Sequence, residues 1–392
     1  MEKEINIDEG VVLGNLKKDY SSAQASKTRV NNAIVGWLRI FNGDKYGNEV
    51  KGRSSIVIKD VKKAIKKMSP SIIQPFIASD VMIKTKPTTM ESVATASRAA
   101  DVLNYQYNNG FDKLHFIRTI ARVFPAEGTI WVRTGWDFKE EEVTRELKGL
   151  TLDDIATLEK SGVSDIEEAY DNGDGTYDLK FSKKVTTVNR PTAIVCKNES
   201  IHADPTAEHP DDCKFVIHEY EKTLSDIKRE KNIYRLTPEK EAALKKHLDD
   251  TNRNSDNPLG AKRYQDGLNN GTDLAFKFST DSNKKIVIIE YWGEYDLDGS
   301  GISKQIVCSW VKGSDIVLRL EENPYPDKKI PFICEAYDLE AFTIWGNSVA
   351  DSIEDNQKIH TAIARGFLDN LSLSNNGQKI VRKGAIDYIK IL

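Results

Sequence analysis

The chain has 392 residues, enough to bury a large core in two or three domains or in one large discontinuous domain. Its 56 basic and 60 acidic residues leave a formal charge of −4, so the overall balance demands neither tight nucleic-acid binding nor attachment to an anionic membrane. Apolar stretches such as "IVII" at 286–289 are far too short to span a membrane, and the start "MEKEINIDEG" has no apolar signal core, which predicts a cytoplasmic location in the cell that makes the chain.

The cysteines favour neither a disulfide framework nor a thiolate zinc site. They lie far apart and form no C-x-x-C pair: Cys196, Cys213, Cys308 and Cys334. We therefore expect reduced, mostly buried thiols, and no cofactor is indicated.

The first predicted element, after a polar leader, is a helix near residues 57–68. Val57, Val61 and Ile65 recur at helical spacing, and lysines fill the remaining surface: Lys59, Lys62, Lys63, Lys66 and Lys67. Such a face could contact phosphate, but most lysine-rich helix faces are solvated surface, because lysine keeps a helix soluble. The lysines alone therefore predict no function.

Helical spacing returns from Glu91 to about Phe124 and is interrupted by "NNG" at 108–110, which favours a helix end and predicts two helices. The segment 128–138 then alternates apolar and polar residues, as a half-buried strand does. Chain character thus changes here from helical to mixed.

The middle of the chain predicts a surface segment with a short helix and strands, followed by two helices. Thr151 opens a short helix, and an Asp-Gly turn at 174–175 precedes a β-rich run. Helices are expected around 223–230 and 237–249, the second with Thr237 as N-cap.

Two further features precede the C-terminal region. Residues 249–273 contain almost no apolar side chains, and we expect a mobile loop over 249–283. Three runs rich in Ile, Val, Tyr and Trp between 284 and 320 then predict an antiparallel β meander.

Two segments imitate metal sites. "DLDGSG" at 296–301 resembles the start of a calcium loop, but its twelfth position is Val307 rather than glutamate, so a hairpin turn is the better account. The segment 202–218 is rich in metal-ligand types, and a metal-dependent hydrolase using four of them is the alternative function: His202, Asp204, His209 and Cys213. The spacing of these residues fits no ligand geometry that we can justify, so a polar loop between strands is favoured.

Phosphate-binding loops and activated serines have no signal. The sequence contains no G-x-x-x-x-G-K-[ST], no G-x-G-x-x-G after a strand and no G-x-S-x-G. An ATPase or a serine hydrolase is therefore disfavoured, and we expect no enzyme.

A long amphipathic helix is predicted beside the C-terminus. Ser348 and Asp351 fit a capping pattern, and the helix continues to about Leu373, where "SNNG" at 374–377 ends it. Glu354 with Lys358, and Arg365 with Asp369, form i,i+4 pairs on its solvated side.

The apolar side of that helix contains polar residues in its middle. Its members at ~100° per residue are Val349, Ile353, Ala364, Phe367, Leu368 and Leu371, interrupted by Asn356, Gln357 and His360. The polar middle favours contact with polar groups of another helix or subunit.

At this point the sequence resembles the portal proteins of tailed bacteriophages, in particular the large portal family typical of short-tailed phages. The resemblance covers roughly residues 50–385 and is carried by several segments in order: "GRSSIVIKDVKKAIKKMSPSIIQPFIASD", "NNGFDKLHFIRTIARVFPAEGTIWVRTGWDF", "AIVCKNESIHADPTAEHPDDCKFVIHEYEKTLSDIK", "EYWGEYDLDGSGI" and "WGNSVADSIEDNQKIHTAIARGFLDNLSLSNNGQ".

The resemblance implies an α+β, mainly helical portal fold, with the antiparallel β meander in the wing and a long C-terminal stem-type helix. It divides the chain into an N-terminal helical part of the wing (1–140), an α+β wing or hip region (141–345), the stem-type helix (346–374) and the start of a clip (375–392). Members of the family usually continue further, so we expect a truncated chain.

The implied function is a ring, usually dodecameric, at one capsid vertex, which passes double-stranded DNA during packaging and ejection without sequence specificity. Implied partners are sister subunits, the terminase large subunit, the major capsid and scaffolding proteins and a head-tail adaptor, with no membrane; implied locations are the virion and, during assembly, the host cytoplasm. Candidates for channel or inter-subunit contacts are Glu354, Lys358, His360, Arg365 and Asp369. A host scaffold protein is a third reading.

Overall fold

The computed structural model describes residues 9–87, 89–110, 112–160, 165–230, 233–250, 280–297, 299–375 and 377. The chain divides into two compact units, each built from separate stretches of sequence. The first unit comprises residues 1–76, 117–132 and 195–392; the second comprises 77–116 and 133–194. The predicted loop over 249–283 and the predicted clip over 375–392 lie mostly outside the described residues.

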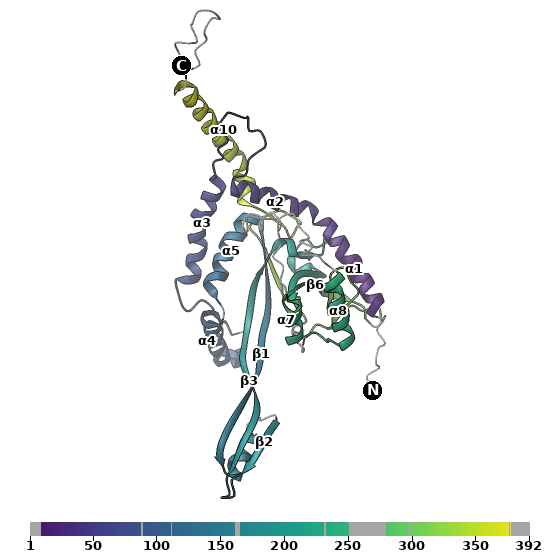
Figure 1. Cartoon of the computed structure of the whole chain (residues 1–392). Coiled ribbons are helices and arrows are strands. Elements are labelled where there is room, and N and C mark those ends of the chain that lie inside the picture. Colours follow the sequence, from purple (N-terminus) through teal and green to yellow (C-terminus); the bar gives the residue numbers. More distant parts are fainter. Residues whose placement is uncertain are drawn as a thin grey trace, which may run out of the picture. The chain divides into compact units, whose positions relative to one another are not determined.

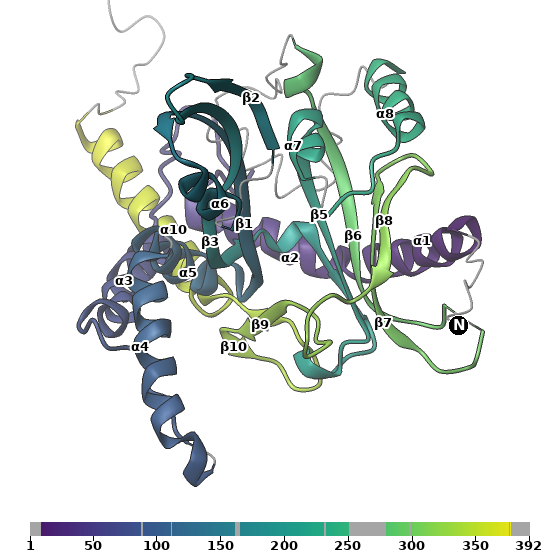
Figure 2. The ribbon, with the colours of Figure 1, turned by 90° about the horizontal axis from the view of Figure 1, so that it is seen from below.

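A five-stranded antiparallel sheet forms one part of the first unit. Its strand order is β4-β5-β6-β7-β8, formed by Ile201–Ala203, Phe215–Thr223, Lys285–Tyr295, Lys304–Val311 and Val317–Glu322. Figure 2 shows β5 to β8 side by side. The predicted meander is therefore confirmed as β6-β7-β8.

Both faces of this sheet are covered. On β6, Ile289 and Tyr291 pack with Leu13 and Leu16 of helix α1, which spans Glu9–Ser26. The alternate residues Ile286 and Ile288 pack instead with the helices of the opposite face, α7 (Leu224–Arg229) and α8 (Pro238–Asp250). Since successive side chains of a strand point to opposite faces, β6 has buried apolar residues on both faces.

Four helices form a second core in the same unit, here called the helical base. They are α2 (Thr28–Asn42), α3 (Asp60–Ile77), α5 (Lys113–Glu127) and α10 (Val349–Asn375). Their buried residues include Ile34, Trp37 and Phe41 of α2 and Val61 and Ile65 of α3, together with Ala126, Val349 and Ala350. Figure 1 shows α10 extending away from this base.

The second unit combines a helix with a long β hairpin. Helix α4 (Val93–Asn109) is held by Asn104, whose side chain accepts hydrogen bonds from Met82 N and Ile83 N at 2.9 Å each. Strands β2 (Asp165–Asp171), β3 (Tyr177–Cys196) and β1 (Thr129–Leu150) lie in that order in the sheet, and β1 begins in the first unit. Helix α6 (Leu152–Lys160) follows β1.

Most predicted elements agree with the structure, including α3, the α4–α5 break at "NNG", β1 and the long C-terminal helix. The polar leader was interpreted wrongly, because it contains α1 and α2. These two helices adjoin at Lys27, whose backbone N–H still donates to Ala23 O at 3.1 Å. Among the described helices, none combines the length and the apolar character that crossing a bilayer requires.

Candidate functional site

Helix α10 begins at a tightly fixed point. The Ser348 hydroxyl lies 2.8 Å from Ala126 O and 3.0 Å from Pro125 O, both in the last turn of α5, and accepts from Ala350 N at 3.0 Å. Ser348 therefore caps α10, as its sequence position predicted, and also joins it to α5.

Two glycines allow the backbones to touch just before the helix starts. Gly128 has a φ of 75°, and a Cβ on it would lie 2.3 Å from Gly346 O, closer than any side chain tolerates. Gly346 N donates to Thr129 Oγ1 at 2.8 Å, and Tyr337 N donates to Gly128 O at 2.8 Å. The direction in which α10 leaves the base is thus set by backbone contacts.

A row of polar residues at four-residue steps runs along one side of α10, here called the polar row: Gln357, Thr361, Arg365 and Asp369. Gln357 is fully buried; its side chain donates to Ile40 O at 3.0 Å and accepts from Val61 N at 3.0 Å. It thereby satisfies the N–H of Val61 at the start of α3, a group that a helix leaves without an intrahelical partner. It also gives Ile40 O a second donor beside Gly43 N, which lies at 3.1 Å.

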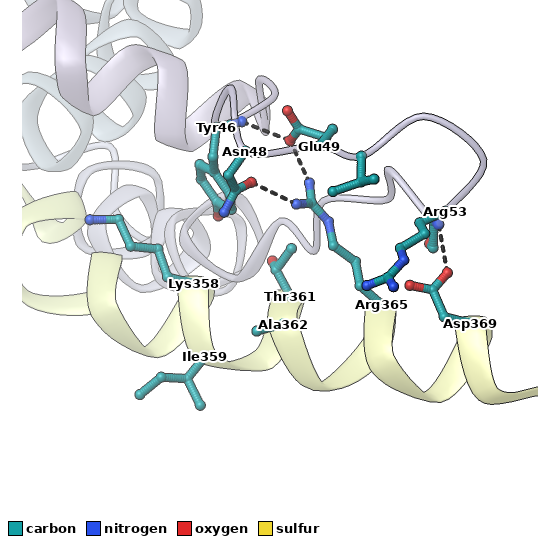
Figure 3. Close-up of a pocket in the computed structure, with 12 residues that line it drawn as sticks. Tyr46, Asn48, Glu49, Arg53, Lys358, Ile359, Thr361, Ala362, Arg365 and Asp369 are labelled. Atoms are coloured by element: carbon teal, nitrogen blue, oxygen red, sulfur yellow. Dashed lines mark hydrogen bonds and ion pairs between the residues drawn. The ribbon is translucent and has the colours of Figure 1, made fainter.

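The rest of the polar row binds the segment 43–59, here called the strap, which connects α2 to α3. Thr361 Oγ1 accepts from Ile58 N at 3.2 Å, and Asp369 Oδ1 accepts from Ser54 N at 2.7 Å. Figure 3 shows the strap lying along α10. The polar row therefore binds the backbone of this same chain.

Arg365 makes the largest set of contacts with the strap. Its Nε donates to Ile56 O at 2.7 Å, its other nitrogens bind Asn48 Oδ1 at 3.0 Å and Glu49 Oε1 at 2.7 Å, and its Cζ lies 5.7 Å from the centre of the Tyr46 ring. The hydrogen bond from Arg365 lowers the pKa of Glu49 below its ordinary value. A groove of about 660 Å³ lies between strap and helix at these residues.

The opposite side of α10 is apolar and exposed. Its residues also follow at four-residue steps, with exposed fractions of 56%, 65%, 69% and 47%: Ile359, Ile363, Phe367 and Leu371. Each lies two positions, or about 200°, from a member of the polar row. The helix, of 27 residues and about 40 Å, thus carries an uncovered apolar face along the part that leaves the base.

The five contact residues predicted from the sequence do not all lie on the same side of α10. Glu354 and Lys358 form the predicted i,i+4 ion pair at 2.6 Å, and His360 Nδ1 lies 2.7 Å from Asp60 Oδ2 on the exposed side. The predicted Arg365–Asp369 pair is wrong, because Arg365 pairs with Glu49 and Asp369 with the Ser54 backbone.

The sequence matches the family described as phage SU10 portal protein over residues 12–392. The chain belongs to this family. Phage portal proteins are capsid components of the vertex that act in genome packaging, and the family is structural rather than enzymatic. The match confirms the resemblance inferred from the sequence, and the structure confirms the mixed α+β fold with its long C-terminal helix.

The candidate metal ligands of the segment 202–218 lie in separate surroundings in the folded portal chain. His202 is buried against Glu219, at 2.8 Å, and Asp204 accepts hydrogen bonds from Thr206 and Lys214, whereas His209 is 67% exposed. Burial raises the pKa of the Cys213 thiol to about 12. Among the described residues, no three potential ligands converge on one point, so the geometry gives the metal-dependent hydrolase no support.

A buried ionic cluster that sequence reasoning missed joins α1 and α2 to the β sheet. Lys27 donates to Asn198 O and Ile201 O and lies 5.1 Å from the centre of the Trp345 ring. Burial lowers its pKa to about 7, although nearby glutamates oppose the shift. Burial alone would raise the pKa of Glu219, but His202, Lys312 and Tyr20 hold it at about 2.

Proposed function

We propose that this portal chain is one subunit of a closed, usually dodecameric ring at a capsid vertex, through which double-stranded DNA passes during packaging and ejection. The observation that carries the proposal is the uncovered face of α10 formed by Ile359, Ile363, Phe367 and Leu371. Burying each such side chain stabilises an assembly by about 1.5–3 kcal/mol, so a face of this size favours association with the same helix of a neighbour.

The bonds of the polar row fix the direction in which the apolar face of α10 points. Because the strap occupies one side of α10, the helix cannot rotate to cover its apolar side within the chain. In a head-to-tail contact, one surface of each subunit binds a different surface of the next. Such contacts form a closed ring when the repeated rotation between neighbours completes a full turn. In this arrangement the stem is α10, preceded by the wing, and residues 375–392 start the clip.

Charge balance is compatible with DNA sliding. If every phosphate were held by Lys or Arg, each step of transport would require breaking ion pairs, so a mixed lining suits a conduit better than a basic groove. Lys358 fits such a lining, since Glu354 and Asp355 pair with it at 2.6 and 3.8 Å. We propose Glu354, Lys358 and His360 as channel or inter-subunit contacts, and Arg365 and Asp369 as positioning residues for the strap.

Partners follow from this role. The terminase large subunit and the head-tail adaptor would dock at the clip, and the major capsid and scaffolding proteins would surround the wing, with assembly in the host cytoplasm before incorporation into the virion. Residues 375–392 provide the test for the terminase: their deletion is expected to abolish co-purification while leaving the wing folded. Unchanged co-purification would contradict docking at this segment.

Electron microscopy of the purified chain tests the ring itself. Rings with a stain-filled centre are expected, with about twelve subunits by native mass spectrometry. A chain that stays monomeric over the whole accessible concentration range would contradict the proposal.

A further inference from the structure

A cluster of cations lies on the helical base and is here called the basic cluster: Lys59 at the end of the strap, Lys62 and Lys66 of α3, and Arg122 of α5. Lys62 Nζ lies 5.3 Å and Arg122 Cζ 5.8 Å from the centre of the same ring, that of Phe41. Contact with one buried aromatic side chain fixes the positions of two cations from different helices.

The basic cluster contains cations without an ion-pair partner among the described residues. Within the part of the chain that the structure describes, no acidic group lies at ion-pair distance from Lys62, Lys66 or Arg122. Burial, and then repulsion from Lys59, Lys66 and Arg122, lowers the pKa of Lys62. The folded chain therefore holds like charges together at a cost that an anionic surface would relieve.

A groove of opposite character lies elsewhere on the same base, here called the acidic groove. It has a volume of about 570 Å³ and an apolar wall from α2 that includes Val30, Ala33 and Ile40. Three carboxylates, those of Glu340, Asp351 and Glu354, line it with a single guanidinium, that of Arg29. Among the described residues, no cation lies at ion-pair distance from Glu340 or Asp351.

The two surfaces belong to different sides of one core. Lys62 and Arg122 contact the ring of Phe41, and Ile40 lines the acidic groove. Phe41 and Ile40 are successive residues of α2, so their side chains point about 100° apart around the helix axis. Figure 1 shows α3 and α5 together on one side of the base of α10, and α2 running from it toward the other side. The packing of the helical base thus holds the basic cluster and the acidic groove on different sides of one core.

We propose that the basic cluster of one copy binds the acidic groove of the next copy in the ring. This rests on the proposed function and assigns a second contact to it, separate from the apolar face of α10. Opposite charges on different surfaces cannot neutralise each other within one chain, but copies related by a rotation bring them together. A two-fold contact through either surface alone would place like charges opposite each other, so the charge pattern selects a head-to-tail arrangement.

Charge reversal of each surface, alone and combined, tests the contact. Lys62→Glu with Lys66→Glu is expected to raise the concentration for half-assembly by about ten-fold or more, measured by sedimentation velocity, and Glu340→Lys with Asp351→Lys should do the same. The variant with all four changes is expected to recover most of the wild-type assembly, because each pair is restored with its polarity exchanged.

A matched control makes the same change in net charge at two lysines outside the basic cluster. Lys51→Glu with Lys67→Glu alters two exposed lysines, one of them on α3 about 100° from Lys66, and is expected to assemble as the wild type does. Circular dichroism melting curves establish that every variant folds. Raising the salt from ~0.05 to ~0.5 M should weaken wild-type assembly and abolish the difference between wild type and the Lys62/Lys66 variant.

The outcomes separate the two proposals. If the wild type forms no oligomer, the proposed ring is wrong. If the wild type forms rings and the Lys62/Lys66 variant assembles equally well, or if the combined variant shows no recovery, the charge contact is wrong and the ring stands. An intact ring that loses binding to a short DNA duplex in the Lys62/Lys66 variant would assign the basic cluster to DNA and likewise overturn the contact.

Discussion

At the scale of single residues, Gln357 shows how one buried side chain joins three helices. It is fully buried and bridges Ile40 O and Val61 N. In Gln357→Leu the N–H of Val61 loses its partner, whereas Ile40 O still accepts from Gly43 N at 3.1 Å. An unsatisfied buried group costs about 1–3 kcal/mol. We expect the free energy of unfolding in urea to fall by about 1–3 kcal/mol, and amide exchange at Val61 to accelerate.

The neighbouring Asn356 provides the control, because it is exposed. Asn356→Leu makes the same gain in apolar surface without removing a buried bridge, and we expect a change within about 0.5 kcal/mol. Equal stability of the two leucine variants would contradict the role assigned to Gln357.

Arg365 determines how firmly the strap is held. Arg365→Lys keeps the positive charge, but an ammonium group cannot reproduce the planar set of bonds to Ile56, Asn48 and Glu49. We expect trypsin to cut at Lys51 and Arg53 about ten-fold faster or more, since losing ~1.4 kcal/mol raises the open population ten-fold. Lys358→Ala, which removes the ion pair to Glu354 on the same helix, should leave the cleavage rate unchanged, and an equal acceleration would contradict this role.

Lys27 predicts a dependence of stability on pH. Its pKa is about 7 in the folded chain and 10.5 ordinarily, so between these values unfolding takes up a proton and raising the pH stabilises the fold. The slope contributed by Lys27 is at most about 1.4 kcal/mol per pH unit. We expect urea titrations from pH ~7.5 to ~9.5 to show a steeper rise for wild type than for Lys27→Met, which has no charge to bury. Parallel slopes would contradict this assignment.

At the scale of elements, sequence reasoning succeeded where local signals suffice. The cap at Ser348 and the helical spacing after it predicted α10 to within two residues, and "NNG" located the break between α4 and α5. Local patterns could have found α2 as well, since Ile34, Leu38 and Phe41 recur at helical spacing. Lys27 lacks any such signal, because only the fold surrounds it with carbonyls and glutamates.

The partner of the polar row could not be read from the sequence. Gln357 and Asp369 bind groups about 300 positions earlier in the chain, and periodicity indicates which side of a helix is polar but not what covers it. The polar middle was predicted to meet another helix or subunit. Gln357 bonds to α2 and α3 of the same chain, and Asn356 is exposed. The same limit explains the 202–218 cluster, whose ligand types are brought into separate surroundings by strand pairing.

The start of α10 is fixed by backbone proximity, which a glycine pair tests. Gly128→Ala would place a Cβ 2.3 Å from Gly346 O at a positive φ, and we expect a loss of more than about 2 kcal/mol, read as a lower melting temperature. Gly366→Ala is the control within α10, where no atom lies within 4 Å of the new Cβ; helix propensity should stabilise it by about 0.5–1 kcal/mol. A tolerated Gly128→Ala would contradict the close approach.

At the scale of the whole molecule, the apolar face of α10 and the charged surfaces of the base make different predictions for assembly. Ile363→Asp with Phe367→Asp places two carboxylates on a face that has exposed fractions of 65% and 69% in the single chain. Because both side chains already contact solvent, we expect the unfolding free energy of the monomer to change by less than about 1 kcal/mol, while ring formation is lost. Sedimentation velocity combined with urea unfolding measures both quantities on the same preparation.

The control is another exposed isoleucine in the first unit. Ile302→Asp lies in the turn between β6 and β7, 70% exposed and on a different element from α10, and should assemble normally. Loss of the ring in the Ile363/Phe367 variant should persist at high salt, since apolar burial depends little on screening, whereas loss through the basic cluster depends on it strongly. An Ile363/Phe367 variant that still forms rings would show that the neighbour does not cover this face, and assembly would then have to rest on other surfaces.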